Sequence, residues 1–305
     1  MNSSRPGIEQ LGTERQSSVS ADLDTLSALE IARLINDEDS KVAGAIQNAL
    51  PEIAQAIEAV ANAIANGGRL IYVGAGTSGR IAALDAAECP PTFNTDPKTV
   101  QFVIAGGERA LSRATETSED SREAGRRDLA KRTPRPKDVV VGVTASGRTP
   151  YTMAALEFAR AKGAKTIAVV CNSDSPVGRA ADVEIVTEVG PEVLSGSTRM
   201  KAGTAQKMVL NMLSTGAMAR LGYIYGNLMV NVHTRNRKLV ERGVVILQKA
   251  AGVDRSTAEH ALKRSGNRVA VALIMLKTGL GGAESAQKLK RAKGNVRNAI
   301  EGPAI

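Results

Sequence analysis

The fold is decided by the stretch Arg69-Leu-Ile-Tyr-Val-Gly-Ala-Gly-Thr-Ser-Gly-Arg-Ile-Ala-Ala-Leu-Asp-Ala-Ala-Glu88-Cys-Pro-Pro-Thr92. Its first apolar run predicts a buried strand, and the glycines and hydroxyls at 74–79 predict a tight turn. A short helix should follow and end at Glu88, because two prolines come directly after. Free N–H groups at a helix amino end bind anions. The stretch therefore indicates an anion cradle with an acid or base one helix length away, as chemistry on a phosphorylated small molecule requires.

Short β-branched runs and helical segments alternate beyond this stretch, which predicts a parallel sheet buried on both faces. The expected strands are 70–73, 100–104, 139–143, 166–170 and 183–186, and the expected helices are 79–88, 119–131, 150–163 and 176–181. This pattern is typical of a doubly wound α/β fold with a five-stranded parallel sheet flanked by helices, spanning about 69–190.

The regions on either side have a different pattern. Residues 1–20 are polar and are expected to form a flexible or partly docked tail, and residues 23–66 repeat apolar residues at helical spacing. The main domain, with its flanking helices, is therefore expected at 21–252. Residues 253–305 predict a small three-helix (UBA-like) module, with helices near 254–265, 268–277 and 282–292.

Composition limits the classes of partner. The chain has 305 residues, a net charge of +9 and only 2% aromatic residues, with two cysteines and two histidines far apart in sequence. A basic protein can steer an anionic substrate, whereas scarce aromatics argue against single-stranded nucleic acid. The spacing of cysteines and histidines argues against a metal site, and no run is long enough to span a membrane. Free cysteines and the lack of a secretory signal predict a cytoplasmic protein.

The turn at 74–79 matches the dinucleotide pattern G-x-G-x-x-G, which leaves a nicotinamide-dependent oxidoreductase as one alternative. Thr77 and Ser78 place hydroxyls beside Gly76, whereas a dinucleotide turn mainly needs close approach of the backbone. Hydroxyls together with free amides suit a phosphate monoester instead.

A second turn repeats the design. After the strand at 139–143, Thr144, Ser146 and Thr149 precede a helix that Pro150 starts. Two such turns on one sheet can place their donors in the same crevice, at the carboxyl ends of the strands. The alternative is that the hydroxyls only cap helices.

A third segment and several carboxylates complete the candidate residues. Ser195, Ser197, Thr198 and Lys201 lie at the start of a long helix and could form a third wall of the site, with hydroxyls and a cation for an acidic substrate. The alternative is that Ser197 or Thr198 simply caps the helix. Two acids near a phosphate crevice could act as a general acid and base. The candidates are Glu88 and, in the second position, Glu119, with Glu116 and Asp120 as neighbours of Glu119.

Taken together, the two turns resemble the phosphate-binding turns of sugar isomerase (SIS) domains. Within that group the chain resembles the N-acetylmuramic acid 6-phosphate etherase family over most of its length. The matching strings are Gly-Ala-Gly-Thr-Ser-Gly-Arg (74–80), Ala-Ala-Glu-Cys-Pro-Pro-Thr-Phe (86–93), Glu-Asp-Ser (119–121), Ala-Ser-Gly-Arg-Thr-Pro-Tyr (145–151) and Gly-Ser-Thr-Arg-Met-Lys-Ala-Gly-Thr-Ala-Gln-Lys (196–207).

The resemblance implies a lyase of cell-wall recycling that needs no metal or cofactor and converts N-acetylmuramate 6-phosphate and water into N-acetylglucosamine 6-phosphate and D-lactate. It places Glu88 as the acid that helps lactate leave and Glu119 as the base at C2, although these two roles could be exchanged. The implied phosphate contacts are Ser78, Thr144, Ser146 and Thr149. A homodimer is the usual state of SIS proteins.

Two alternatives within the superfamily stay open. A sugar-phosphate sensor similar to the glucokinase regulatory protein would need the hydroxyl turns but neither glutamate. A sugar-phosphate isomerase is disfavoured, because the second turn reads Thr-Ala-Ser-Gly-Arg-Thr where many isomerases have Ser-Gln-Ser-Gly-Glu-Thr.

Overall fold

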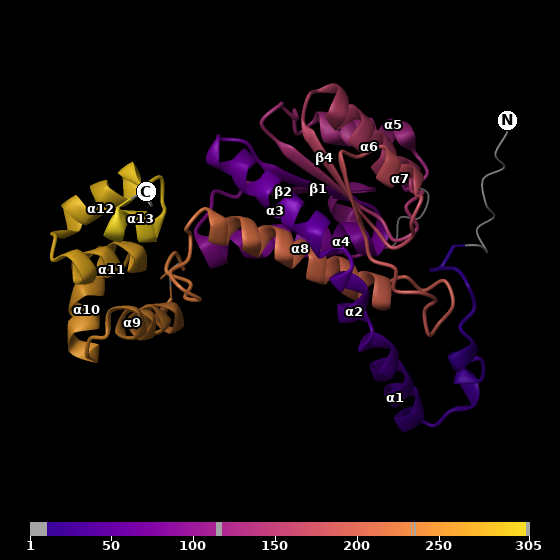
Figure 1. Cartoon of the computed structure of the whole chain (residues 1–305), viewed down its shortest axis with the longest axis horizontal. Coiled ribbons are helices and arrows are strands. Elements are labelled where there is room, and N and C mark those ends of the chain that lie inside the picture. The colour runs from indigo at the N-terminus through magenta and orange to yellow at the C-terminus, as the bar shows by residue number, and fades with distance from the viewer. Residues whose placement is uncertain (1–10, 114–117, 233, 235, 303–305) are drawn as a thin grey trace. The chain divides into compact units, whose positions relative to one another are not determined.

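The computed structural model describes residues 11–113, 118–232, 234 and 236–302. Its centre is a parallel sheet in the order β2-β1-β3-β4-β5 (Figure 1). The strands are β1 (Leu70–Gly74), β2 (Val100–Ile104), β3 (Val139–Val143), β4 (Lys165–Val170) and β5 (Val183–Val186). The doubly wound parallel sheet is therefore confirmed, and every strand end lies within one residue of its expected position.

Helices cover both faces of this sheet. Figure 1 shows α5, α6 and α7 on one face and α3, α4 and α8 on the other. Apolar side chains of the sheet, such as Ile71 and Val140, pack against Tyr151 and Leu156 of α6. The helices of this part are α1 (Ala28–Asp39), α2 (Val42–Gln47), α3 (Leu50–Ala65), α4 (Gly76–Phe93), α5 (Arg122–Ala130), α6 (Pro150–Ala161), α7 (Pro176–Arg179) and α8 (Lys201–Arg220).

The helix after β1 is longer than the sequence predicts. Instead of ending at Glu88, α4 continues through Pro90 and Pro91 to Phe93. Proline removes a backbone donor, but its φ is compatible with a helix. The Pro90 carbonyl still accepts the N–H of Asn94, and the chain turns only there, where φ is +56°.

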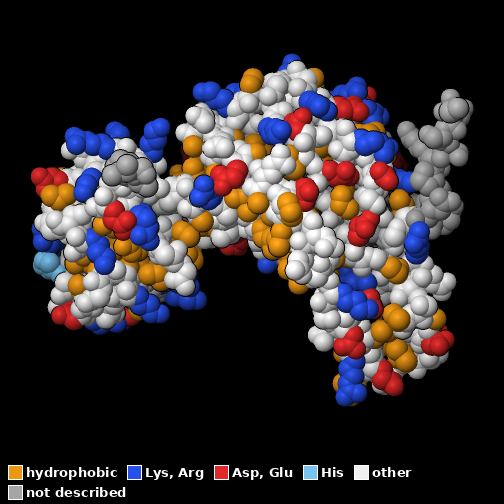
Figure 2. Space-filling view, viewed as in Figure 1, with side chains coloured by type: hydrophobic (Ala, Val, Ile, Leu, Met, Phe, Trp, Pro, Cys, Tyr) orange, Lys and Arg blue, Asp and Glu red, His pale blue; other side chains and the backbone are white. Residues whose placement is uncertain are grey.

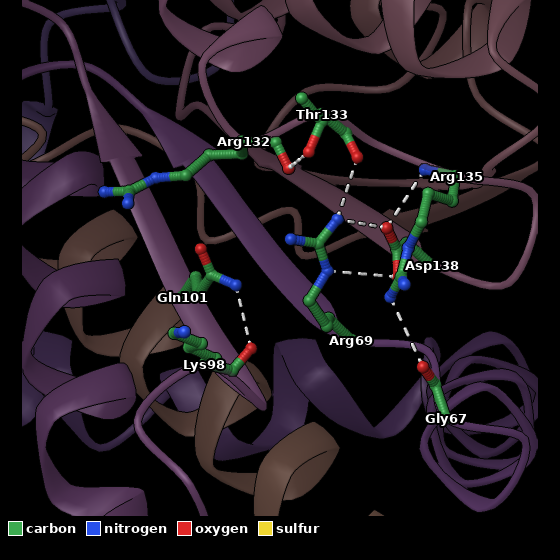
Figure 3. A network of polar contacts seen from close by, with 8 residues as sticks. All are labelled: Gly67, Arg69, Lys98, Gln101, Arg132, Thr133, Arg135 and Asp138. Carbon is green, nitrogen blue, oxygen red and sulfur yellow. Dashed lines mark hydrogen bonds and ion pairs between the residues drawn. The ribbon is translucent and has the colours of Figure 1, made fainter.

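At the amino ends of the strands, an ion-pair network joins the residues that precede β1 and β3 (Figure 3). Arg69 donates from Nε and Nη2 to the two carboxylate oxygens of Asp138, at 3.2 and 2.5 Å. Arg135 donates to the same carboxylate, and its Nη2 also reaches the Gly67 carbonyl. Burial alone would raise the pKa of Asp138, but the bonds from Arg69 and Arg135 outweigh it, so this pKa is lowered.

Contacts divide the chain into two units. The first contains Met1–Ala86 and Lys98–Ser214, and the second contains Ala87–Pro97 and Thr215–Ile305. Residues 215–252 are grouped with the helices that follow them, because the helix at 237–251 packs on those at 255–264 and 269–278. The domain boundary expected at 252/253 stays a prediction. Both α4 and α8 run from the first unit into the second.

The described part of 253–305 has four helices where three were expected, and a further helix of the unit precedes them. The five are α9 (Arg237–Ala251), α10 (Arg255–Arg264), α11 (Val269–Thr278), α12 (Gly282–Arg291) and α13 (Val296–Glu301), and α11 is the buried central one. Among the described residues no single helix is long and apolar enough to cross a membrane. By length and composition alone the pair α11 and α12, bent by 106°, passes that test together.

Charge is distributed unevenly along the chain. Residues 215–305 contain 16 Lys and Arg but five Asp and Glu, whereas residues 1–214 contain 24 and 26. Figure 2 shows Lys and Arg side chains gathered over the helices of the second unit. The positive charge of the protein therefore does not come from the unit that contains the sheet.

The Arg69–Asp138 contact gives a test of stability. Asp138→Asn should lower the free energy of unfolding by up to about 3 kcal/mol at pH 7, because it removes one partner of a buried ion pair. Since folding lowers the pKa of Asp138, its contribution is present above the ordinary value of 3.8 and is lost as the pH falls below it. Urea unfolding of both proteins at pH 7 and pH 3 measures this.

The difference between wild type and variant should shrink at the lower pH. Glu241→Gln, which breaks an exposed pair with Arg255, is the control and should leave unfolding unchanged. An Asp138→Asn protein as stable as wild type at pH 7 would show that the network does not hold the strands.

Candidate active site

The two hydroxyl-rich turns start side by side. β1 pairs with β3 in parallel register, with Gly74 opposite Val143, so the residues that follow them leave adjacent strand ends. Neighbouring strands lie about 4.8 Å apart. The chain leaves β1 for β2 on one side and later returns to β3 on the other. Ligands of doubly wound sheets bind at this reversal of strand order.

In the first turn, glycines allow α4 to begin close to the sheet. A Cβ atom on Gly79 would lie 2.5 Å from Cγ1 of Ile104 on β2, and Gly76 adopts a left-handed φ of +53°. Ser78 is buried and Thr77 is half-buried at the first turn of α4. The first N–H groups of a helix have no acceptor within it, so this end of α4 offers donors beside the Ser78 hydroxyl.

In the second turn, three hydroxyls converge. Thr144 Oγ1 lies 2.8 Å from Thr149 Oγ1 and 3.5 Å from Ser146 Oγ, which also accepts the N–H of Arg148 at 3.2 Å. Thr149 is the N-cap residue of α6, but its side chain makes no capping hydrogen bond. For Thr149, the alternative that the hydroxyl only caps a helix is therefore wrong, and the cluster has the composition of a phosphate cradle.

The structure brings Glu119 next to this second turn. The Glu119 carbonyl accepts the N–H of Tyr151, in the first turn of α6, at 3.0 Å. Two residues later, Ser121 caps α5 through the N–H of Ala124, so α5 starts three residues after the helix start expected at 119. The Glu119 and Asp120 side chains are exposed, and Glu116 lies outside the described residues.

Glu88 is an exposed residue in the last part of α4. It follows Ser78 by ten residues, which corresponds to about 15 Å along a helix axis. No hydrogen bond or ion pair between Glu88 and the other expected site residues occurs among the residues that the structure describes. Its role as the acid stays a prediction.

One turn before Glu88, a buried carboxylate fixes the position of α4. Asp85 accepts hydrogen bonds from Tyr72 Oη at 2.8 Å, Asn211 Nδ2 at 2.7 Å and Ser214 Oγ at 3.0 Å. Burial raises the pKa of Asp85 despite these donors. The three bonds tie α4 to β1 and to α8, so the helix that carries Glu88 is held on two sides.

The segment at 190–200 provides the N-terminal cap of α8, but through a residue that the sequence did not indicate. The buried carboxylate of Glu192 accepts the N–H groups of Lys201 and Ala202, both at 2.9 Å. The cap therefore comes from Glu192, not from Ser197 or Thr198, which lie half-buried in the turn before the helix. Because a carboxylate of the protein already occupies this helix end, α8 is no anion site for a ligand.

Two further candidates of this segment have partners within the protein. Lys201 is 2% exposed, and its Nζ lies 2.6 Å from Glu38 Oε2 on α1. Ser195 Oγ donates to the carbonyls of Glu14 and Arg15, at 3.4 and 3.3 Å. These contacts favour structural roles, and substrate contacts by Ser195, Ser197, Thr198 and Lys201 stay predictions.

A cavity of about 580 Å³ opens beside the second turn, at the carboxyl ends of β3, β4 and β5. Its lining combines cations, carboxylates and hydroxyls, as a charged sugar would need. The lining residues are Ser146, Arg148, Cys171, Asn172, Ser173, Asp174, Ser175, Glu188, Gly190 and, from the N-terminal segment, Leu11, Gly12 and Arg15.

Sequence reasoning missed Asn172 and the N-terminal segment. Asn172 follows a buried strand at the same sheet edge as the two turns, and that position was the available signal. The residues around Thr13 carry no periodic pattern, and the expectation of a tail at 1–20 rests on their polarity alone. In the structure Thr13 is fully buried.

Comparison with known proteins agrees with this architecture. A family model described as "Glucokinase regulatory protein N-terminal SIS domain" matches residues 52–160. The chain is 52% identical to an N-acetylmuramic acid 6-phosphate etherase of Edwardsiella ictaluri (strain 93-146), covering 96% of this chain and 98% of that protein. It is 48% identical to the protein of that name in Vibrio vulnificus (strain YJ016), with the same coverage.

A solved structure supports the fold. The phosphoheptose isomerase from Francisella tularensis superposes with a TM-score of 0.50 at 19% identity, covering 64% of this chain and all of that one. At this identity the likeness concerns the fold alone, which is the SIS architecture expected from the two turns.

The hydroxyl cluster predicts a phosphate-dependent loss of binding. Ser146→Ala should lower the affinity for N-acetylglucosamine 6-phosphate by about ten- to a hundredfold, since a hydrogen bond to a charged group contributes about 1.5–3 kcal/mol. Calorimetry with this ligand and with unphosphorylated N-acetylglucosamine measures the difference. Ser256→Ala, on the exposed start of α10, is the control. Equal weakening of both ligands would contradict a phosphate cradle.

Proposed function

Because the chain belongs to the N-acetylmuramic acid 6-phosphate etherase family, we propose that it releases D-lactate from N-acetylmuramate 6-phosphate by elimination followed by hydration. The etherase class follows from relatives that are about half identical over nearly the whole chain. The order of steps and the residues that perform them are the parts proposed here.

The observation that carries the proposal is the convergence of Thr144, Ser146 and Thr149 beside the Glu119 backbone. Hydroxyls and helix amino ends are suitable donors for a phosphate monoester. A carboxylate on the adjoining segment would then stand near the sugar carbons that follow the phosphate.

In the elimination step, the open-chain sugar has an aldehyde at C1 that makes the C2 proton acidic. Glu119 takes this proton, and the C–H electron pair becomes the C2–C3 double bond. The C3–O bond breaks, and Glu88 donates a proton to the leaving lactate oxygen. A positioned acid and base of this kind typically contribute about 10²–10⁴-fold each.

In the hydration step, water adds to C3 of the unsaturated aldehyde, and the Glu88 carboxylate accepts a proton from it. Glu119 returns its proton to C2. Both glutamates recover their starting states, and the sum of the two steps is one water consumed for one lactate released. No electron transfer is involved, so the residues of this chain suffice for the proton movements.

The etherase relatives favour this function over the two alternatives within the superfamily. A sensor would bind the sugar phosphate unchanged, and an isomerase would leave the lactyl ether intact. From the resemblance we also infer a homodimer in the cytoplasm with a role in peptidoglycan recycling, acting on a phosphorylated amino sugar without nucleic acid or membrane as partner.

Lactate release tests the reaction directly. The wild-type protein should release one D-lactate per N-acetylmuramate 6-phosphate, and Glu88→Gln should lower kcat at least about a hundredfold, because glutamine cannot donate the proton. An enzymatic D-lactate assay gives the rate, and circular dichroism checks the fold. Glu58→Gln, an exposed glutamate on α3, should keep normal turnover; near-normal turnover of Glu88→Gln would contradict its role.

Proton exchange tests the second glutamate. Incubated in deuterated water, the wild-type protein should exchange the C2 proton of N-acetylglucosamine 6-phosphate, whereas Glu119→Gln should not, since the base at C2 is gone. Nuclear magnetic resonance of the sugar measures the exchange. Asp120→Asn is the matched control and should exchange normally. Exchange that stops in Asp120→Asn but continues in Glu119→Gln would move the base by one residue.

A further inference from the structure

The N-terminal segment lies on the cavity that adjoins the phosphate cradle. Leu11, Gly12 and Arg15 line the same space as Ser146. They precede the sheet by more than fifty residues, and none belongs to the turns that resemble SIS domains. The cavity therefore has a wall that the cradle motifs do not account for.

This wall is held to the second turn by a side-chain relay. The Thr13 N–H donates to Asn172 Oδ1 at 3.4 Å, and Asn172 Nδ2 donates to Thr13 Oγ1 at 3.0 Å. Asn172 Nδ2 also donates to the carbonyl of Ala145, the residue between Thr144 and Ser146, at 3.0 Å. Thr13 and Asn172 are both buried. The segment thus takes its position from the cradle itself.

The other side of the segment is fixed as well. Glu14 and Arg15 donate their N–H groups to the Leu11 carbonyl, which closes a tight turn. Ser195 Oγ binds the carbonyls of Glu14 and Arg15. Hydrogen bonds from Ser195 Oγ to its carbonyl and from its N–H to Leu11 therefore hold the Arg15 backbone, while its side chain stays exposed at the cavity.

The charges of the cavity are local. Residues 1–214 carry a net charge of −2, so an anionic ligand depends on nearby cations. The cavity offers Arg15 and Arg148, together with Asp174 and Glu188, whose carboxylates can accept bonds from sugar hydroxyls. Arg148 belongs to the cradle turn. Arg15 makes no ion pair with the residues that the structure describes.

From this arrangement we infer that residues 11–15 form a substrate wall and that Arg15 binds the lactyl carboxylate. The inference rests on the proposed function, because that substrate carries two anions and its sugar product only one. The cradle takes the phosphate. A guanidinium is planar and pairs with a carboxylate through two parallel hydrogen bonds. Arg15 would then distinguish the lactyl ether from the free amino sugar.

Binding to two ligands tests the inference. In a Glu88→Gln background, which prevents turnover, calorimetry measures the affinities for N-acetylmuramate 6-phosphate and N-acetylglucosamine 6-phosphate. Adding Arg15→Gln should weaken the first about ten- to a hundredfold, as loss of a charged hydrogen bond does, and leave the second within about twofold. Arg33→Gln, an exposed arginine on α1, is the control and should change neither.

A second variant tests the relay. Thr13→Val keeps the size of the side chain but removes the hydroxyl that Asn172 binds, and it should shift the two affinities in the same unequal way by a smaller factor. Equal loss for both ligands, or no loss for either, would overturn the inference. If wild type releases no lactate but the unequal loss is found, the proposed reaction fails while recognition of the carboxylate stands.

Discussion

Arg69 and Asp138 hold together the residues that lead into β1 and β3, and the site at the opposite ends of these strands depends on that pairing. Parallel strands have no turn to set their register, so it must come from contacts between them. A shift of one residue would turn every side chain of β3 to the other face and move Thr144 away from the first turn. The buried Asp138 carboxylate, bound by Arg69 and Arg135, resists such a shift.

Much of this fold could be predicted because its signals are local. A strand buried on both faces is a short β-branched run, and the runs near 70, 100 and 140 end where the apolar residues end. The hydroxyl turns are local too, since each follows its strand directly. That Glu119 lies beside Tyr151 is a consequence of α5 packing on α6. The sequence indicated Glu119 as a candidate acid or base but not its neighbour on α6.

The rest depends on partners that are distant in sequence. Thr13 lies 159 residues from Asn172, and Lys201 lies 163 residues from Glu38. Polarity predicts exposure for such residues, yet each is buried because a second polar residue satisfies it. Packing also overrides the local signal at Pro90. Proline lowers helix propensity, yet α4 continues through it because the neighbouring Cys89 and Phe93 are buried.

Glu88 and Glu119, the two proposed catalytic residues, lie on segments that are fixed in position, although their side chains are exposed. A carboxylate fixed by its own hydrogen bonds in the interior is poorly placed to exchange protons with a ligand, and Asp85, with three donors, is an example. The Glu119 carbonyl accepts the N–H of Tyr151, and Glu88 lies on the helix that Asp85 anchors. Both side chains are exposed. Main-chain and neighbouring contacts thus provide the rigidity that the proposed catalytic roles of Glu88 and Glu119 would require, while both side chains lie at the surface.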